Sequence, residues 1–160
     1  MTGEPMSRKL AGFVRSVGIP VRFEALPDPT FLPGFDIRFG TLVIDEARLL
    51  YPGDILHEAG HIAVSDPAER EQERLDPSPG DEMATIAWSY AAACHLGIPL
   101  EVLFHPDGYK GDAEALIENF STGHYLGVPL LQLYGLTVEP HRAAEEGADP
   151  YPHMTGWLRS

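Results

Sequence analysis

The pentapeptide His57-Glu58-Ala59-Gly60-His61 constrains this chain more than any other stretch. On a helix, residues four apart lie about 40° apart around the axis and about 6 Å apart along it, so both imidazoles point to one side. Two imidazoles placed in this way can bind one metal ion. Glu58 is rotated away from that line, so its carboxylate can stand beside the metal as a general base for a metal-activated water. The fold must therefore leave room on the histidine side of this helix.

The flanking residues predict the bounds of this helix. Pro52 suits a first helical position, and Asp54 suits a first turn, where acids favour the helix dipole. Pro67 prevents continuation, so the helix is expected from about 52 to 65. Ile55, Ala59 and Ile62 form an apolar stripe on another side. The helix is therefore expected to be buried on most of its circumference and to pack one face on a sheet.

The rest of the chain is expected to form short elements, because it holds 15 prolines and 16 glycines among 160 residues. Apolar periodicity and turn residues predict a helix, a small and mostly antiparallel sheet, and later helices. The helix is expected over 5–17, the strands near 21–26, 36–39 and 41–44, and the later helices near 81–96, 99–104, 112–122 and 128–134. Residues 66–80 are charged and bracketed by prolines, which indicates a solvated loop.

The predicted fold class is therefore α+β, with an N-terminal helix, a small sheet, the central His-Glu-x-x-His helix and several C-terminal helices. The length favours one compact domain over residues 1–160. Residues 137–160 are expected to be a polar C-terminal tail that docks on the body through Trp157 and Leu158.

The formal net charge of −13 argues against nucleic acid and against an anionic membrane as partners, because both favour Lys and Arg. The chain has no run of about 20 apolar residues and no signal-peptide core, which predicts a cytoplasmic protein. The expected partner is a polypeptide substrate or another protein. The single cysteine, Cys94, excludes an internal disulfide.

Two histidines do not complete a catalytic zinc site, which usually has three protein ligands and one open position. Glu82 is the predicted third ligand, because a carboxylate in the first turn of the next helix points at whatever packs against that end. It shares a face with Ile86 and Ala93, whereas Asp81 lies about 100° away. Glu82 is preferred because Asp81 is the better N-cap and because the face with Ile86 and Ala93 is smaller and can pack more closely. Asp81 is the alternative ligand.

These residues carry a family resemblance. His57-Glu58-Ala59-Gly60-His61 resembles the zincin signature, and with Glu82 the pattern resembles the gluzincin metallopeptidases. The segments 41–48 and 82–88 are similar to those of the compact ImmA/IrrE-like metallopeptidases, so the resemblance covers residues 36 to 100. The chain departs from their Ala-Asn-x-Phe-Ala-like run, since it has no Asn there and carries Trp88 near the expected Phe.

The resemblance implies a minimal zincin-like fold and a zinc-dependent peptidase. One zinc ion would be held by His57, His61 and Glu82, with Glu58 as the general base that acts on a metal-activated water. The oxyanion also needs a donor, and the candidates are Tyr90, Tyr109, His124 and Tyr125. The alternative is a non-catalytic, zinc-stabilised regulatory or protein-interaction domain with the peptidase fold. There a fourth side chain would close the site, although lone histidines are more often surface or hydrogen-bonded residues. The histidines in question are His95, His105, His124 and His153.

Overall fold

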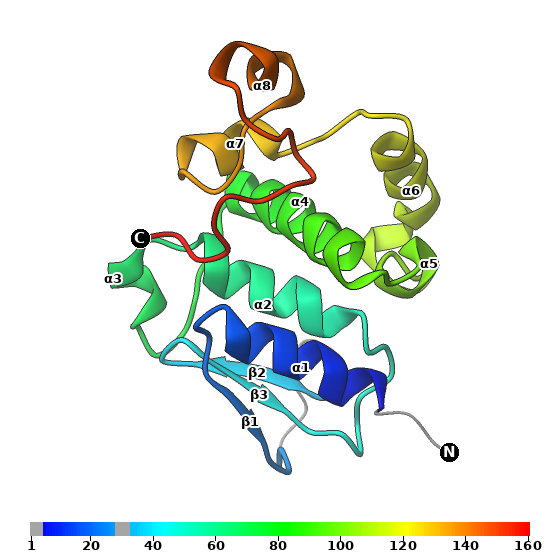
Figure 1. Cartoon of the computed structure of the whole chain (residues 1–160). Coiled ribbons are helices and arrows are strands. Elements are labelled where there is room, and N and C mark those ends of the chain that lie inside the picture. The colour runs from blue at the N-terminus through cyan, green and yellow to red at the C-terminus, as the bar shows by residue number, and fades with distance from the viewer. Residues whose placement is uncertain (1–4, 28–32) are drawn as a thin grey trace.

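The structure is a computed structural model that describes residues 5–27 and 33–160. The chain forms helices and one small sheet, which confirms the α+β class, and Figure 1 shows the sheet at one end of the molecule with the helices stacked beside it. The first part of the chain holds α1 (Met6–Ser16), β1 (Val21–Phe23), β2 (Phe35–Arg38), β3 (Thr41–Ile44), α2 (Asp54–Val64) and α3 (Pro67–Arg70). The second part holds α4 (Pro79–Leu96), α5 (Leu100–Leu103), the 3-10 helix η1 (Tyr109–Gly111), α6 (Ala113–Ser121), α7 (Val128–Leu133) and α8 (Pro140–Glu146). No helix in the described ranges has both the length and the apolar character needed to cross a membrane.

The sheet has the strand order β1-β3-β2. β2 and β3 form the expected antiparallel hairpin, in which Phe39 and Gly40 take positive φ angles of 51° and 74°. β1 pairs with β3 in parallel, with Val21 opposite Leu42. One of the two pairings is thus parallel, so the sheet is mixed rather than mostly antiparallel. β2 lies at an edge of the three described strands.

α2 is the central helix, as expected. Figure 1 shows it between α4 on one side and α1 with the sheet on the other. It begins at Asp54, two residues later than predicted, because residues 51–54 form a turn in which the Asp54 N–H donates to the Tyr51 carbonyl oxygen. Gly53 permits the approach of α5 to this turn, since a Cβ at Gly53 would lie 2.2 Å from the Val102 carbonyl oxygen.

α2 and α4 approach each other closely at Gly60. A Cβ on Gly60 would lie 3.0 Å from Thr85 Cγ2 and 3.2 Å from Trp88 Cε3. Thr85 and Trp88 are fully buried, so neither side chain has free space into which it can move. The glycine inside the pentapeptide therefore sets the distance between the two helices that carry the candidate ligands.

Substitution of Gly60 by alanine will destabilise the fold by about 1–3 kcal/mol, because the added methyl overpacks this contact. Gly12→Ala is the matched control, since Gly12 is exposed on α1 and nothing lies within 4 Å of an added Cβ. The control should stabilise the protein by about 0.4–1 kcal/mol, as alanine does at unstrained glycine positions. Chemical denaturation measures both changes. A Gly60→Ala protein as stable as wild type would contradict the close approach.

The start of α4 corrects the sequence prediction. Residues 66–80 contain the short helix α3 as well as a loop, and α4 begins at Pro79 rather than Asp81. Ser78 is the N-cap. Its hydroxyl accepts from the Asp81 N–H, and the Asp81 carboxylate accepts from the Ser78 N–H. Asp81 is thus the third helical residue of a capping box and not the N-cap.

Residues 137–160 contact the body of the protein, and they include helix α8 where only a polar tail was expected. Trp88 Nε1 donates to the Trp157 carbonyl oxygen at 2.9 Å. The Tyr151 hydroxyl is buried and donates to the Ala87 carbonyl oxygen at 2.7 Å. Arg159 donates to the Val64 carbonyl oxygen at 3.1 Å, at the C-terminal end of α2. The tail therefore holds both helices that carry the candidate ligands.

Candidate metal centre

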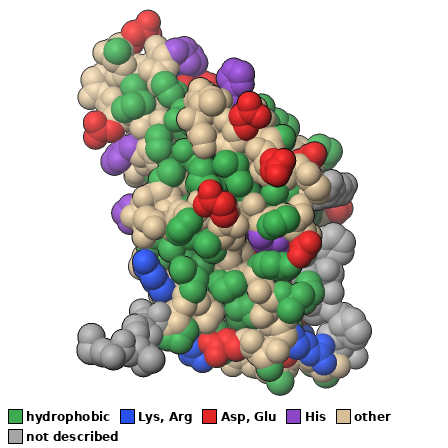
Figure 2. All heavy atoms as spheres, turned by 90° about the vertical axis from the view of Figure 1, so that its right-hand side faces the viewer, with side chains coloured by type: hydrophobic (Ala, Val, Ile, Leu, Met, Phe, Trp, Pro, Cys, Tyr) green, Lys and Arg blue, Asp and Glu red, His purple; other side chains and the backbone are tan. Residues whose placement is uncertain are grey.

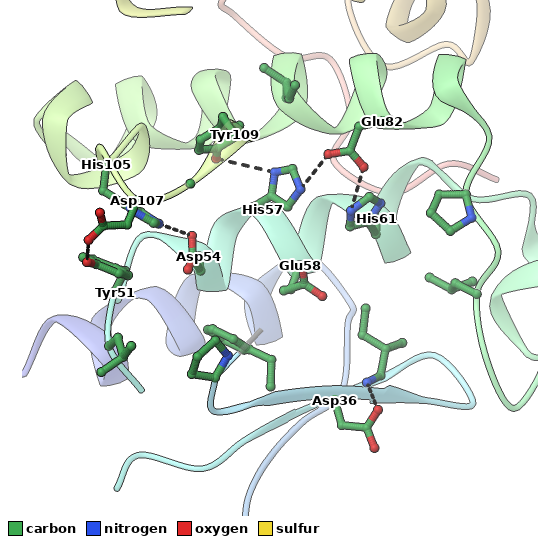
Figure 3. A pocket seen from close by; sticks show the side chains of 18 of the residues that line it. Asp36, Tyr51, Asp54, His57, Glu58, His61, Glu82, His105, Asp107 and Tyr109 are labelled. Carbon is green, nitrogen blue, oxygen red and sulfur yellow. Dashed lines mark hydrogen bonds and ion pairs between the residues drawn. The ribbon is translucent and has the colours of Figure 1, made fainter. Parts of the chain in front are cut away.

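Helices α2 and α4 bring three potential metal ligands together (Figure 3). His57 Nε2 lies 2.9 Å from Glu82 Oε1, and His61 Nε2 lies 3.2 Å from Glu82 Oε2. Their ligand atoms all lie within 4.8 Å of one another. Ligands at about 2.0–2.1 Å from a tetrahedral zinc ion are about 3.3 Å apart. The donor set and its spacing therefore fit one such ion.

Glu82, rather than Asp81, lies beside the histidines. The Asp81 carboxylate is used in the capping box and also accepts a hydrogen bond from the Tyr134 hydroxyl at 3.5 Å. The next residue along the helix faces α2 instead, which puts the Glu82 carboxylate between the two imidazoles. Asp81 is thus occupied elsewhere, and Glu82 is the carboxylate that the fold offers to a metal.

A hydroxyl group contacts Nδ1 of His61, the ring nitrogen that faces away from Glu82. Thr85 Oγ1 lies 3.3 Å from His61 Nδ1 and donates its own proton to the Asp81 carbonyl oxygen at 2.7 Å. A hydroxyl has a single proton, so this oxygen can only accept from the imidazole. His61 therefore carries a proton on Nδ1, and the lone pair of Nε2 is left for a metal.

His57 has a matching partner on another element. The Tyr109 hydroxyl lies 3.5 Å from His57 Nδ1 and donates to the Leu103 carbonyl oxygen at 3.4 Å. By the same reasoning this hydroxyl accepts from Nδ1–H and leaves Nε2 available. Both histidines are thus held in the tautomer that a metal site requires, with both Nε2 atoms directed at Glu82.

The surroundings shift the pKa values of Glu82 and Glu58 in opposite directions. When no metal is bound and Nε2 of each histidine carries a proton, hydrogen bonds from His57 and His61 hold the pKa of the Glu82 carboxyl well below its ordinary value, against the opposing effect of burial. Burial raises the pKa of Glu58, and the nearby histidines only partly offset this rise. Glu82 is thus a stable anion, as a ligand should be, whereas Glu58 has the increased proton affinity that suits a general base.

The three candidate ligands and Glu58 line one cleft of about 1520 Å³, bordered by β2 and by α4. In Figure 3, Glu58 projects from α2 on the side of the sheet, and His57 and His61 project toward α4. Figure 2 shows hydrophobic side chains gathered on the face that carries α5 and α6, with acidic side chains among them. Apolar residues on both walls of the cleft are Phe35, Ile37, Met83, Ile86 and Leu116. Polar groups thus converge at one point between apolar walls, as in many ligand sites.

The four candidate oxyanion donors differ in their position relative to the cleft. Tyr109 lines the cleft, and the other three do not. Tyr90 packs against Phe120, and Tyr125 packs against Tyr90. His124 lies exposed between α6 and α7. Tyr109 already donates its proton to a carbonyl oxygen, so its position favours a role toward His57.

Two residues of the cleft were not predicted as a pair. Asp54 was expected only to favour the helix dipole, and His105 was expected to be an ordinary hydrogen-bonded histidine. The structure confirms that His105 is hydrogen-bonded, with its Nε2 2.8 Å from Asp54 Oδ1. In the described part of the chain, no fourth side chain joins the group formed by His57, His61 and Glu82. The residue types were the only sequence signal for the Asp54–His105 pair.

Comparison of the chain with models of protein families, with curated proteins and with solved structures gave no match. The assignment of a function therefore depends on the chemistry of the cleft.

Proposed function

We propose that this chain is a zinc-dependent peptidase, with zinc held by His57, His61 and Glu82. The supporting observation is that the hydroxyls of Thr85 and Tyr109 contact Nδ1 of His61 and Nδ1 of His57, the ring nitrogens that face away from Glu82. If Glu82 only paired with the histidines, each Nε2 would need a proton in addition to the proton on Nδ1. Two largely buried imidazolium ions would then face one carboxylate. A divalent ion at the same point uses both Nε2 lone pairs and removes this conflict.

Two imidazoles and one carboxylate are a donor set that suits catalytic zinc with one open position. A zinc ion held by these three residues would polarise a scissile carbonyl and lower the pKa of a water that it binds. Glu58 lies outside the ligand group and lines the same cleft. It takes the proton of the attacking water and delivers it to the leaving amine, which is why its raised pKa matters.

The substrate that fits this cleft is an extended segment of polypeptide. Strand β2 borders one side, and apolar side chains stand on both walls. An extended chain alternates its side chains between two directions, so it can place apolar groups on both walls at once. The net charge of −13 disfavours nucleic acid and anionic membranes as partners.

The proposal is tested with fluorescein-labelled casein as an unfolded polypeptide. Zinc-loaded protein should cleave it, a chelator should stop the cleavage, and added zinc should restore it. Protein that binds one equivalent of zinc and cleaves no unfolded polypeptide would contradict peptidase activity. That result would favour the alternative, a non-catalytic zinc-stabilised domain that acts through a protein partner.

The metal-free and the zinc-bound protein should respond to pH in opposite directions. Burial lowers the pKa of His61, but the hydrogen bond with Glu82 and the charges of Glu58, Glu82 and Asp81 outweigh it and raise the pKa above the ordinary value of 6.5. The stability that His61 contributes without metal is fully present below pH 6.5 and is lost as the pH rises through the raised pKa. Zinc needs an unprotonated Nε2, so its binding strengthens over the same rise.

The rise in melting temperature on addition of zinc should therefore be larger at about pH 8 than at about pH 5.5. Thermal unfolding with and without zinc at the two pH values measures it. His61→Ala is the control and should show little zinc-induced rise at either pH, because it lacks both the ligand and the titrating group. An equal rise at both pH values in the wild-type protein would contradict the assignment of His61.

A further inference from the structure

The segment after α5 is fastened to the first turn of α2 by the buried pair of Asp54 and His105 (Figure 3). His105 Nε2 lies 2.8 Å from Asp54 Oδ1, and His105 and Asp54 are only 6% and 7% exposed. A buried polar pair is stable only where its geometry is well satisfied, because both groups lose their hydration. The first turn of α2 and the segment that carries Tyr109 are thus held in one relative position.

The imidazole of His105 is also packed closely by Tyr51 and Gly108. The Tyr51 ring stacks on one face with a centroid distance of 3.7 Å and an interplanar angle of 8°. Gly108 also approaches the ring closely, since a Cβ at Gly108 would lie 2.9 Å from His105 Cε1. The Tyr51 hydroxyl in turn donates to Asp107, two residues beyond His105. The ring therefore has little freedom to turn.

Tyr109 is the residue after Gly108. It has a φ of 57°, in the left-handed region that tyrosine seldom adopts. Such a conformation persists only where the surrounding structure enforces it. Its ring lies edge-on to His57 with a centroid distance of 5.3 Å, and its hydroxyl lies 3.5 Å from His57 Nδ1. The fold thus maintains a strained backbone at the residue that orients a candidate metal ligand.

We propose that His105 is a positioning residue, which holds Tyr109 against His57 through its pair with Asp54. Asp54 and His57 are three residues apart and therefore lie on neighbouring parts of the same helix face. The contacts run from Asp54 through His105 and Tyr109 back to His57, so they form a closed loop around the first turn of α2. The loop fixes the orientation of the His57 ring, and this role rests on the proposed metal site.

The test compares variants with the wild-type protein by two measurements. These are zinc affinity, from competition with a chelating dye, and the visible spectrum of the cobalt-substituted protein. Tyr109→Phe and His105→Ala should each weaken zinc binding about 10–100-fold, as loss of an outer hydrogen bond to a ligand histidine does. Both should shift the cobalt absorption in the same direction. His105→Gln, which can still donate to Asp54, should retain most of the affinity. The double variant should bind no more weakly than either single variant, because both remove the same restraint.

Gly108→Ala gives the same information without removing a buried partner. Gly108 has an ordinary φ of −109°, so the added methyl acts only by displacing the His105 ring. It should weaken zinc binding and shift the cobalt spectrum, as His105→Ala does, and it replaces that variant if His105→Ala does not fold. A variant with a lower melting temperature but unchanged zinc affinity would overturn the proposal, as would effects of His105→Ala and Tyr109→Phe that multiply. Wild-type protein that binds neither zinc nor cobalt would instead overturn the metal site itself.

Discussion

Replacement of Glu58 by glutamine will reduce kcat/KM for a polypeptide substrate by about 10²–10⁴-fold while one zinc ion stays bound. Glutamine keeps the shape of the side chain but cannot accept a proton from water. Glu58 is not part of the ligand group, so metal affinity should not depend on its charge in a direct way. Peptidase assays on matched zinc-loaded samples, with the zinc content of each sample measured, give the comparison.

The control is the zinc content itself. If Glu58→Gln retains zinc and cleaves casein at the wild-type rate, Glu58 is not the general base. If neither protein cleaves anything while both hold zinc, the non-catalytic alternative is favoured.

The second large effect is on zinc affinity, and it should distinguish Glu82 from its neighbour Asp81. Glu82→Ala will weaken zinc binding by more than about 100-fold, because it removes a direct ligand and not an outer contact. Asp81→Ala will leave zinc affinity close to wild type but destabilise the protein by about 1 kcal/mol, since it breaks the capping box with Ser78. The two substitutions remove the same charge one residue apart, so each is the control for the other.

Zinc titration and chemical denaturation of both variants measure these two effects. Loss of zinc on Asp81→Ala with retention on Glu82→Ala would reverse the ligand assignment. Loss of zinc in both would show that the position of α4 matters more than either side chain.

Much of the fold follows from local patterns. The bounds of α2 and α6 were predicted within a few residues, because prolines, glycines and apolar periodicity mark them. The start of α4 was missed, although Ser78-Pro79-Gly80-Asp81 has the serine and acid spacing of a capping box. Helix α8 also carries its signals, Pro140 at the start and Gly147 at the end, but a short polar helix has little stability of its own.

The direction of β1 relative to β3 could not be read from the sequence. Alternating residues predict a strand but not its neighbour, and the parallel pairing of Val21 with Leu42 depends on the path of the chain between them. The error in the sheet type is therefore one of long-range pairing and not of strand recognition.

The site was predictable where helix geometry alone decides it. The spacing of His57 and His61 fixes a common direction, and the faces of α4 favoured Glu82 over Asp81. The contact between Asp54 and His105 joins residues 51 positions apart and depends on how α5 packs on the start of α2. No local pattern contains that information. The same holds for Tyr109, which only the three-dimensional fold separates from Tyr90, Tyr125 and His124.

The central claim is that His57, His61 and Glu82 hold one zinc ion and leave a position open toward Glu58. A crystal structure of the zinc-loaded protein, with anomalous diffraction recorded at the zinc edge, tests it most directly. The account predicts one anomalous peak about 2.0–2.2 Å from both Nε2 atoms and from a Glu82 carboxylate oxygen, with a water as the remaining ligand. The absence of a peak between these atoms, a peak elsewhere, or a protein side chain in the fourth position would contradict it.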